Sequence, residues 1–528
     1  MSKTVPYEGS RPFVFVSYSH SDADIVKETI DILHERYNYR IWFDNGIHTG
    51  ENWSKKIVKQ IQQCSAFVVF LSPNATKSRN VGSEISIAFN NNNAKIIPIW
   101  ITEKCQLDGG TEYYLSGFQR ALENVPGIHS AEDMAVELDA AIPDSLRDAF
   151  MVENNILVNT EDNIHDLILD PTITEIADSA CKERLHLKTI QFSDSVEYIG
   201  NEVFRGCSSI RELFIPKNVK HIGDSCFRDC VGLRKLNIQE EIEIGERAFE
   251  NCRELSEISL PNDLAEIYSG VFNSCHSLVE INLPSSLFAI GDNAFASCSR
   301  LKRITLPNGV SRIDDAVFSG CTSLEAVSIP ESVSKIGKNV FKDCTSLTRI
   351  NIPAGVRKID SGCFRGCSSL TEINVNPRNK KYKSMDGVMF SKNKSVIVCH
   401  PANIDSEEYE IPDSVSIIED WAFANCTKLK KVIIPDSVEI IGEGAFIGCT
   451  NLEEIYIPYS VDCINDTAFR GCKNLKRVYI ESKTLKDFGW GIFYRCSRDL
   501  VVYYCSYVVK EYCERLNINH ERFTPKGD

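Results

Sequence analysis

A Phe-x-x-Cys pattern recurs through most of this chain, and it limits the possible folds more than any other feature. It starts at Phe204 and Cys207 and returns every 23 residues, with one step of 22 and a last step of 24. The further cysteines are Cys230, Cys252, Cys275, Cys298, Cys321, Cys344, Cys367, Cys426, Cys449, Cys472 and Cys496. Each unit reads roughly Ile-x-x-Ile-Gly-x-x-x-Phe-x-x-Cys-x-x-Leu-x-x-Ile-x-Ile-Pro. Such a period predicts a solenoid whose units bury their apolar faces only against their neighbours.

The limits of the repeat region follow from the same phase. A degenerate first copy has Cys181 in the Phe position, which gives about thirteen units over residues 170–499. The step from Cys367 to Cys426 is 59 residues, so 36 are inserted, and we place them at 376–410. Tyr382 to Phe390 predicts a hairpin through Asp-Gly. Residues 500–528 are expected to form a C-terminal cap, with a last strand at Leu500–Tyr504 and a helix at Ser506–Leu516.

Composition narrows the classes of function. The 21 cysteines include no Cys-x-x-Cys pair, and pairs such as Cys226/Cys230 fall inside the repeat, so we expect core thiols and no metal. A net charge of −15 argues against a general nucleic-acid binder. No apolar run approaches the roughly 18 residues that span a bilayer, and the polar start of the chain has no signal core. We therefore expect a cytoplasmic protein with reduced thiols.

The first part of the chain has a different pattern. After a tail at 1–10, residues 11–145 alternate apolar runs with amphipathic segments, which predicts a parallel, doubly wound α/β sheet. The expected strands contain Phe13–Val16, Tyr39–Phe43, Phe67–Leu71 and Ile96–Trp100. Pro98 favours a peripheral place for the last of these. Ser21-x-x-Asp24 predicts a capping box. Residues 146–169 are expected to link the two domains by a packed connection.

Glu84 stands out in this first part. It follows the strand Phe67–Leu71 and the turn Ser72-Pro73-Asn74. Open α/β sheets bind ligands beyond the carboxyl ends of their strands, so a carboxylate here suggests chemistry. The alternative is that Glu84 lies in the first turn of a helix and only complements the helix macrodipole.

Both parts resemble known families. The phased Phe-x-x-Cys and Ile-x-Ile-Pro motifs resemble the BspA-type leucine-rich repeats, which implies a solenoid that binds a ligand and carries no chemistry of its own. Residues 12–140 resemble the Toll/interleukin-1 receptor (TIR) domain, which implies a flavodoxin-like α/β fold. The matching motifs are Phe15-Val16-Ser17-Tyr18-Ser19, Ile41-Trp42-Phe43-Asp44-Asn45-Gly46 continuing to Trp53, Phe70-Leu71-Ser72-Pro73-Asn74, Ser78 to Glu84, and Ile96-Ile97-Pro98.

TIR domains are of two kinds, adaptors and enzymes that cleave NAD. In the enzymatic kind a glutamate follows a serine by six positions, as Glu84 follows Ser78 here. Nicotinamide departs as a neutral group, so the main need is to stabilise an oxocarbenium-like ribose, which one carboxylate can do. Tyr18 and Trp53 are candidates to hold nicotinamide. The alternative is a solvated loop position for Tyr18 and core packing for Trp53. The candidates for ribose or phosphate binding and loop shape are Ser17, Ser19, Asp44, Gly46 and Ser78.

The combined expectation is a cytosolic sensor joined to an effector. A protein or microbial ligand would bind the repeats, and TIR self-association would switch on cleavage of NAD to nicotinamide and ADP-ribose or a cyclic relative, in immune or cell-death signalling. NAD is then substrate, and no cofactor is needed. The first alternative is a non-enzymatic scaffold that works by homotypic TIR interactions. The second is an adhesin, because BspA-type repeats also occur on cell surfaces.

Overall fold

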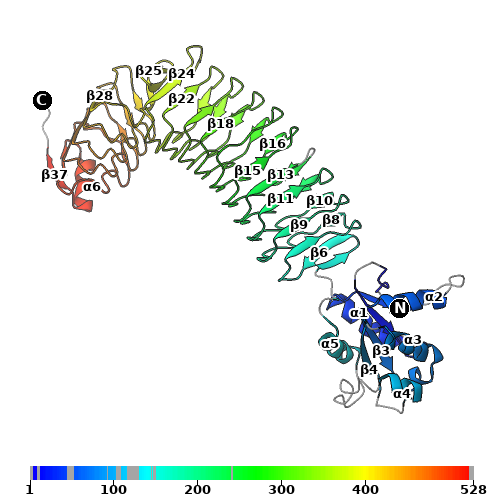
Figure 1. Cartoon of the computed structure of the whole chain (residues 1–528). Helices are drawn as coiled ribbons and strands as arrows, with labels where there is room; N and C mark the ends of the chain where they lie inside the picture. The colour runs from blue at the N-terminus through cyan, green and yellow to red at the C-terminus, as the bar shows by residue number, and fades with distance from the viewer. Residues whose placement is uncertain are drawn as a thin grey trace. The chain divides into compact units, whose positions relative to one another are not determined.

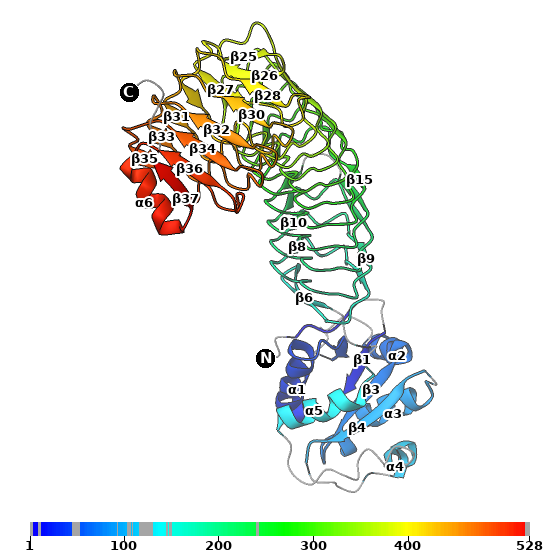
Figure 2. The same cartoon turned by 90° about the vertical axis from the view of Figure 1, so that its left-hand side faces the viewer.

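The computed structural model divides the chain into two compact units, Met1–Met151 and Val152–Asp528 (Figures 1 and 2). The structure describes residues 4–8, 12–44, 53–91, 93–102, 107, 109–115, 130–143, 146, 150–238 and 242–522. The first unit is an α/β domain and the second is a repeat solenoid, as the two sequence patterns predict.

The first unit is built on four parallel strands in the order β2-β1-β3-β4. These are β1 (Val14–Ser17), β2 (Ile41–Phe43), β3 (Ala66–Leu71) and β4 (Lys95–Trp100). The helical segments are η1 (His20–Asp22), α1 (Ala23–Glu35), α2 (Trp53–Gln63), η2 (Ala75–Lys77), α3 (Arg79–Phe89), α4 (Gly109–Leu115) and α5 (Ala131–Ala141). Pro98 lies in β4 at the edge of the sheet, where its missing N–H breaks no ladder.

Both faces of this sheet are covered. On one face, Val14 and Val16 pack with Ile30 of α1 and Met134 of α5. On the other face, Phe15 packs with Ile61 of α2 and Ile85 of α3. Because successive residues of a strand point to opposite faces, a strand buried on both sides must be apolar throughout. This explains the unbroken apolar runs that predicted the strands.

The second unit consists of coils that stack side by side, with strands in two parallel columns (Figure 1). The column of short strands contains β6 (Ile156–Thr160), β8 (Glu175–Ile176), β10 (Tyr198–Ile199), β12 (His221–Ile222), β14 (Glu243–Ile244), β16 (Glu266–Ile267), β17 (Ala289–Ile290), β19 (Arg312–Ile313), β21 (Lys335–Ile336), β23 (Lys358–Ile359), β27 (Val396–Cys399), β29 (Ile417–Ile418), β31 (Ile440–Ile441), β33 (Cys463–Ile464) and β35 (Asp487–Phe488). The other column contains β7 (Asp166–Ile168), β9 (Thr189–Gln191), β11 (Glu212–Ile215), β13 (Lys235–Ile238), β15 (Glu257–Ser259), β18 (Arg303–Thr305), β20 (Ala326–Ser328), β22 (Arg349–Ile352), β24 (Glu372–Val375), β28 (Glu408–Glu410), β30 (Lys431–Ile433), β32 (Glu454–Ile457), β34 (Arg477–Ile480) and β36 (Val501–Tyr504).

The solenoid begins earlier than residue 170. Strand β5 (Phe150–Glu153), β6 and β7 all lie in the segment that we expected to be a linker. β6 pairs in parallel with β8, and β7 pairs in parallel with β9, so both belong to the solenoid sheets. The repeat motif is missing here because the first coil buries only one of its sides against a neighbour.

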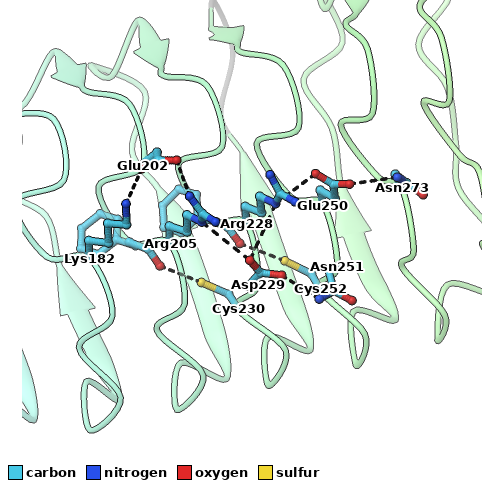
Figure 3. Close-up of polar contacts among 12 residues, drawn as sticks. Lys182, Glu202, Arg205, Arg228, Asp229, Cys230, Glu250, Asn251, Cys252 and Asn273 are labelled. Atoms are coloured by element: carbon cyan, nitrogen blue, oxygen red, sulfur yellow. Dashed lines mark hydrogen bonds and ion pairs between the residues drawn. The ribbon is translucent and has the colours of Figure 1, made fainter.

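The repeat phenylalanines and cysteines form the core of the solenoid. Where two neighbouring coils both have phenylalanine in the Phe position, the two rings stack with centroids 4.9 to 6.0 Å apart. The repeat thiols donate to the carbonyl of the residue in the Phe position one coil earlier, as Cys230 does to Phe204 at 3.1 Å and Cys252 to Phe227 at 3.3 Å (Figure 3). Burial raises the pKa of the Cys321 thiol to about 12. The cysteines in the described ranges form no disulfides, and most of them are buried in the core.

Charged side chains form a chain of contacts along the turns that carry this motif (Figure 3). Lys182 and Arg205 both contact Glu202, at 2.6 and 2.5 Å. Arg228 contacts Glu250 at 3.1 Å in the next coil. Lys182, directly after the Phe position of its coil, thus meets Glu202, two places before Phe204 of the next coil, whereas Arg228 meets Glu250, directly after Phe249.

The insertion contains one more coil than the repeat count. Its hairpin is confirmed: β25 (Tyr382–Met385) pairs antiparallel with β26 (Val388–Ser391), and Asp386 and Gly387 have φ of 49° and 79°. β27 and β28 then continue the two strand columns. His400 replaces the stacking Phe, with its ring 5.1 Å from that of Phe423. A histidine in the Phe position conceals this coil in the sequence.

The C-terminal cap has one strand more than predicted. Helix α6 (Tyr507–Leu516) follows β36 as expected, but β37 (Asn519–Arg522) then pairs in parallel with β36. The Tyr512 hydroxyl of α6 accepts a hydrogen bond from the Ile492 N–H at 3.0 Å. The cap thus provides a hydrogen-bond acceptor for the Ile492 N–H of the last coil.

Candidate functional site

The candidate site lies where the strand order of the first unit reverses. β2 lies on one side of β1 and β3 on the other, so the chain leaves β1 and β3 in opposite directions across the sheet. Open α/β sheets bind ligands at the carboxyl ends of strands at such a point. Ser17 is the last residue of β1, Asp44 directly follows β2, and Glu84 is on α3, after β3.

Glu84 points to the end of β1 and is not a first-turn residue. Helix α3 begins at Arg79 and has no acidic residue in its first turn, so the macrodipole interpretation of Glu84 is wrong. The Ser17 hydroxyl donates a hydrogen bond of 2.5 Å to Oε2 of Glu84. This contact joins two segments that are 67 residues apart in the sequence.

The electrostatics of Glu84 differ from those of a surface carboxylate. Its pKa is raised from 4.5 to about 7, mainly by burial and also by nearby Asp44, while the Ser17 hydrogen bond acts in the opposite direction. A carboxyl with a pKa near 7 is balanced between its two forms at neutral pH. Perturbed groups of this kind cluster at functional sites.

Tyr18, Asp44 and His20 line the same place. The Tyr18 hydroxyl donates to the Asp44 carbonyl at 2.8 Å, and burial, Asp44 and Glu84 raise the Tyr18 pKa to about 12. Nε2 of His20 lies 3.7 Å from Oδ2 of Asp44. The rings of His20 and Tyr18 meet edge to face, with centroids 6.0 Å apart.

A cavity of about 30 Å³ lies between these side chains. It is lined by Phe15, Val16, Tyr18, His20, Asp44, Ser78, Asn80 and Glu84. Its volume is close to that of one water molecule, whereas pockets for small molecules measure roughly 300 Å³ or more. Among the described residues the site has polar groups in place but no room for a dinucleotide.

The structure brings most of the predicted residues together. Ser17 and Glu84 are joined by a hydrogen bond, and Tyr18, Asp44 and Ser78 line the cavity with Glu84. Ser78 also caps α3, because its side chain accepts from the Val81 N–H at 3.4 Å. Ser19 is half-buried at the start of η1 and does not line the cavity. Gly46 and the side chain of Trp53 lie outside the described residues.

The sequence did not identify two residues that line the cavity, and it predicted one helix cap at the wrong residue. His20 and Asn80 line the cavity, and each stands two residues from a candidate that was named, Tyr18 and Ser78. The capping box at Ser21 is wrong, because α1 begins at Ala23 after Asp22.

Asp22 instead joins two loops at this edge of the sheet. Its carboxylate accepts from the hydroxyl of Ser72 at 2.5 Å and from the amide of Asn74 at 3.0 Å. This ties the segment after β1 to the segment after β3 and fixes the loop that leads to α3.

The described residues include no group of three or more His, Cys, Asp or Glu side chains that could hold a metal ion. Within the same residues no helix combines the length and apolar character needed to cross a bilayer.

Comparison with known proteins agrees with both units. The model of the BspA-type leucine-rich repeat region matches residues 174–302, 288–405 and 402–513, which is more than half of the chain. The TIR domain model matches residues 14–124. No curated protein matches the chain.

Among solved structures, the chain is similar to leucine-rich repeat proteins of bacteria. One from Bacteroides ovatus is 26% identical over 69% of this chain and 86% of its own, with a TM-score of 0.46. A leucine-rich cell surface protein from Faecalibacterium prausnitzii is 24% identical over 65% of this chain and 92% of its own, with a TM-score of 0.42. The pneumococcal vaccine antigen PcpA is 17% identical over 71% of this chain and 96% of its own, with a TM-score of 0.38.

A TIR domain joined to leucine-rich repeats supports a role in signalling or sensing. The chain belongs to the family of BspA-type leucine-rich repeat proteins and carries an N-terminal TIR domain.

Proposed function

We propose that the TIR domain is an NAD glycohydrolase that cleaves NAD to nicotinamide and ADP-ribose or a cyclic ADP-ribose product. The observation that carries the proposal is the Glu84 carboxyl, which is held by Ser17 at 2.5 Å at the switch point of the sheet. A half-buried position that raises the pKa to about 7 does not stabilise a glutamate whose role is purely structural. A group that must stabilise positive charge on a bound ribose does gain from it.

The chemistry asks little beyond one carboxylate. In hydrolysis the bond between C1′ of the ribose and the nicotinamide nitrogen breaks, and nicotinamide leaves with the bonding electrons as a neutral molecule. Water adds to C1′ and one proton is released. The ionised Glu84 stabilises the positive ribose in the transition state. Tyr18 supplies an aromatic ring beside the same cavity.

The size of the cavity implies a conformational step before cleavage. At about 30 Å³ it does not hold NAD. We propose that self-association of TIR domains opens and completes the site around Asp44, and that a protein or microbial ligand on the repeats triggers this step. The protein would then be a cytoplasmic sensor-effector in immune or cell-death signalling.

The test is release of nicotinamide from NAD by the full chain, free and clustered on beads. Glu84→Ala removes the carboxylate, and Glu28→Ala removes an exposed carboxylate of α1 as a matched control. We expect activity in the wild type and the control and none in Glu84→Ala. Equal activity in all three proteins would refute the role of Glu84.

A second candidate is a non-enzymatic TIR scaffold that signals by homotypic TIR interactions. The small cavity favours it, because a docking module needs no substrate pocket. Absence of nicotinamide release under every clustering condition, together with self-association that survives Glu84→Ala, would support this function instead.

A further inference from the structure

The turns of the solenoid are joined by backbone hydrogen bonds that run from each coil to the next. The donors are the N–H groups of the Phe position and of the residues two places before and after it. Asn339, Phe341 and Asp343, for example, donate to the carbonyls of the following coil at 3.4, 2.9 and 2.7 Å. The same three bonds recur in the complete coils from Cys181 to Phe469, with one exception.

The exception is the coil of Phe364, which precedes the inserted coil. Its N–H groups at Gly362, Phe364 and Gly366 have no acceptor among the described residues. On the far side of the inserted coil, the His400 N–H reaches the Ala422 carbonyl at 2.7 Å. The inserted coil therefore keeps its strands but lacks the turn that would meet these donors.

The coil of Phe423 shows the other side of the same gap. The carbonyls of Asp420 and Ala424 stand where the missing turn would have donated to them, and no described residue bonds to either. Backbone layers in such a stack lie about 4.8 Å apart. One missing layer thus leaves space for one backbone segment, with donors on one wall and acceptors on the other.

A cavity of about 200 Å³ occupies this place. Gly362 and Phe364 line one wall, Asp420 and Trp421 line the other, and Cys399 of β27 contributes to the lining between them. Its volume exceeds the roughly 150 Å³ of a cavity that holds benzene. The cavity therefore has room for a small organic molecule as well as for water.

Two charged side chains at the cavity form no ion pair with a described residue. The guanidinium of Arg365 lies over the Trp421 ring at 3.8 Å, and Asp343 and Glu443 attract it without a direct ion pair. The Glu419 carboxyl is half-buried and makes no hydrogen bond within the described chain. Asp360, by contrast, is already paired with Lys358 at 2.7 Å.

Trp421 is an unusual residue for its position. It has φ of 62°, a region that bulky residues rarely adopt. The equivalent residues of other coils include Ala316 and Thr467, with φ of 56° and 55°. The Trp421 ring lies so close to Gly444 that an added Cβ there would come within 2.5 Å of it. Strained residues of this kind persist where the surrounding structure or function requires them.

Trp421 and Arg365 together span the gap. In a regular pair of coils the equivalent side chains, such as Lys182 and Glu202, meet across one step (Figure 3). Here the same two positions meet across two steps, because the inserted coil provides no turn between them. Their contact therefore joins the two walls of the cavity that both side chains line.

We propose that this cavity binds the α-amino carboxylate of a free amino acid or of a short peptide. The ligand's carboxylate or carbonyl oxygens accept from the open N–H groups of Gly362 and Phe364 and from Arg365. Its amino group donates to Glu419 and to the Asp420 carbonyl. The ligand takes the place of the missing turn and restores the ladder between the two halves of the solenoid.

The cavity is then the site at which the repeats bind the ligand proposed above. The proposal does not depend on whether the TIR domain cleaves NAD. The test is calorimetric titration of the full chain with L-alanine, with trialanine and with N-acetyl-L-alanine methylamide. The first two carry the charged groups on a residue and on a peptide, and the third carries amides without charge. We expect saturable binding of alanine or trialanine and weaker binding of the uncharged amide.

Arg365→Ala tests the anion contact, and Arg470→Ala is its matched control. Arg470 stands at the same place in a regular coil and lies over Tyr494 at 5.3 Å. Alanine occurs naturally at this place as Ala296, so both variants should fold. Arg365→Ala should weaken binding roughly tenfold or more, and Arg470→Ala, which only removes a repulsive charge that acts on Arg365, should not weaken it.

Hydrogen exchange gives a second readout that does not depend on the substitutions. Bound ligand should slow amide exchange in the segment 359–367 and leave the equivalent segment 441–449 unchanged. Three results would each overturn the proposal: no saturable binding of either charged probe, equal binding of the uncharged amide, or binding that Arg365→Ala leaves intact.

Discussion

Replacing Ser17 by alanine should shift the pH dependence of NAD cleavage toward higher pH. The Ser17 hydroxyl donates to Glu84 at 2.5 Å, and this bond favours the ionised carboxylate. Burial acts the other way and raises the pKa of Glu84 to about 7. Without the Ser17 hydroxyl, the contact that lowers the pKa of Glu84 is lost. The pKa should therefore rise, and the carboxyl should keep its proton to a higher pH.

The size of the effect follows from the strength of the bond. A hydrogen bond to a charged group contributes about 1.5–3 kcal/mol, and about 1.4 kcal/mol corresponds to a tenfold change in proton affinity. The acid limb of the activity profile should therefore move up by about one to two pH units. At pH 7, where about half of Glu84 is ionised in the wild type, activity should fall roughly five- to fiftyfold and recover as the pH rises.

The assay is nicotinamide release by the clustered full chain between pH 5.5 and 9.5, with the Glu84 carboxyl followed by 13C NMR in parallel. Ser83→Ala is the control, because the exposed Ser83 hydroxyl donates to the Arg79 carbonyl of its own helix at 2.9 Å and does not line the cavity. Loss of activity in Ser17→Ala by the same factor at every pH would refute the reasoning. So would an unchanged titration of Glu84.

Three further predictions concern stability. Glu84→Gln should stabilise the TIR domain in calorimetry by an amount on the order of 3 kcal/mol above pH 7, because the pKa of Glu84 is raised from 4.5 to about 7. Below pH 4.5 the substitution should not change the stability. Equal effects at pH 8 and pH 4 would contradict this. Burial lowers the pKa of His400 from 6.5 to about 4 and its Nε2 has no partner, so His400→Phe should raise the melting temperature at pH 7 and more strongly near pH 4.5. Phe295→Ala should cost about 3–5 kcal/mol, whereas Phe214→Ala, at a side chain that is 55% exposed, should cost far less.

The fold could be predicted largely because each unit repeats a simple rule. Strands that are buried on both faces are apolar throughout, and every regular coil repeats Phe and Cys at the same places. The rule fails where a coil departs from the consensus. His400 stacks on Phe423 as a phenylalanine would, but no periodicity marks it. The first coil was likewise taken for a linker, because β6 has only one neighbouring coil of the regular kind.

The candidate site was predictable in its members but not in its contacts. Glu84, Tyr18 and Asp44 come from three segments whose convergence follows from parallel strand ends. The bond from Ser17 to Glu84 does not follow, because it depends on how α3 is rotated against the sheet. The role of Asp22 as a bridge between loops was also hidden, because a capping box and a loop bridge use the same residue types.

The places where this chain departs from local preference differ in what surrounds them. Glu84, Trp421 and His400 are each unfavourable where they stand: a half-buried carboxyl, a bulky residue with positive φ, and a buried ring nitrogen without a partner. Glu84 and Trp421 both line cavities, with other polar groups aimed at the same space. His400 does not line the cavity beside it, and a phenylalanine would fill its place as well. A departure from local preference thus indicates function only where the side chain also faces space that a ligand can enter. By that criterion Glu84 and Trp421 each mark a candidate site within the described residues.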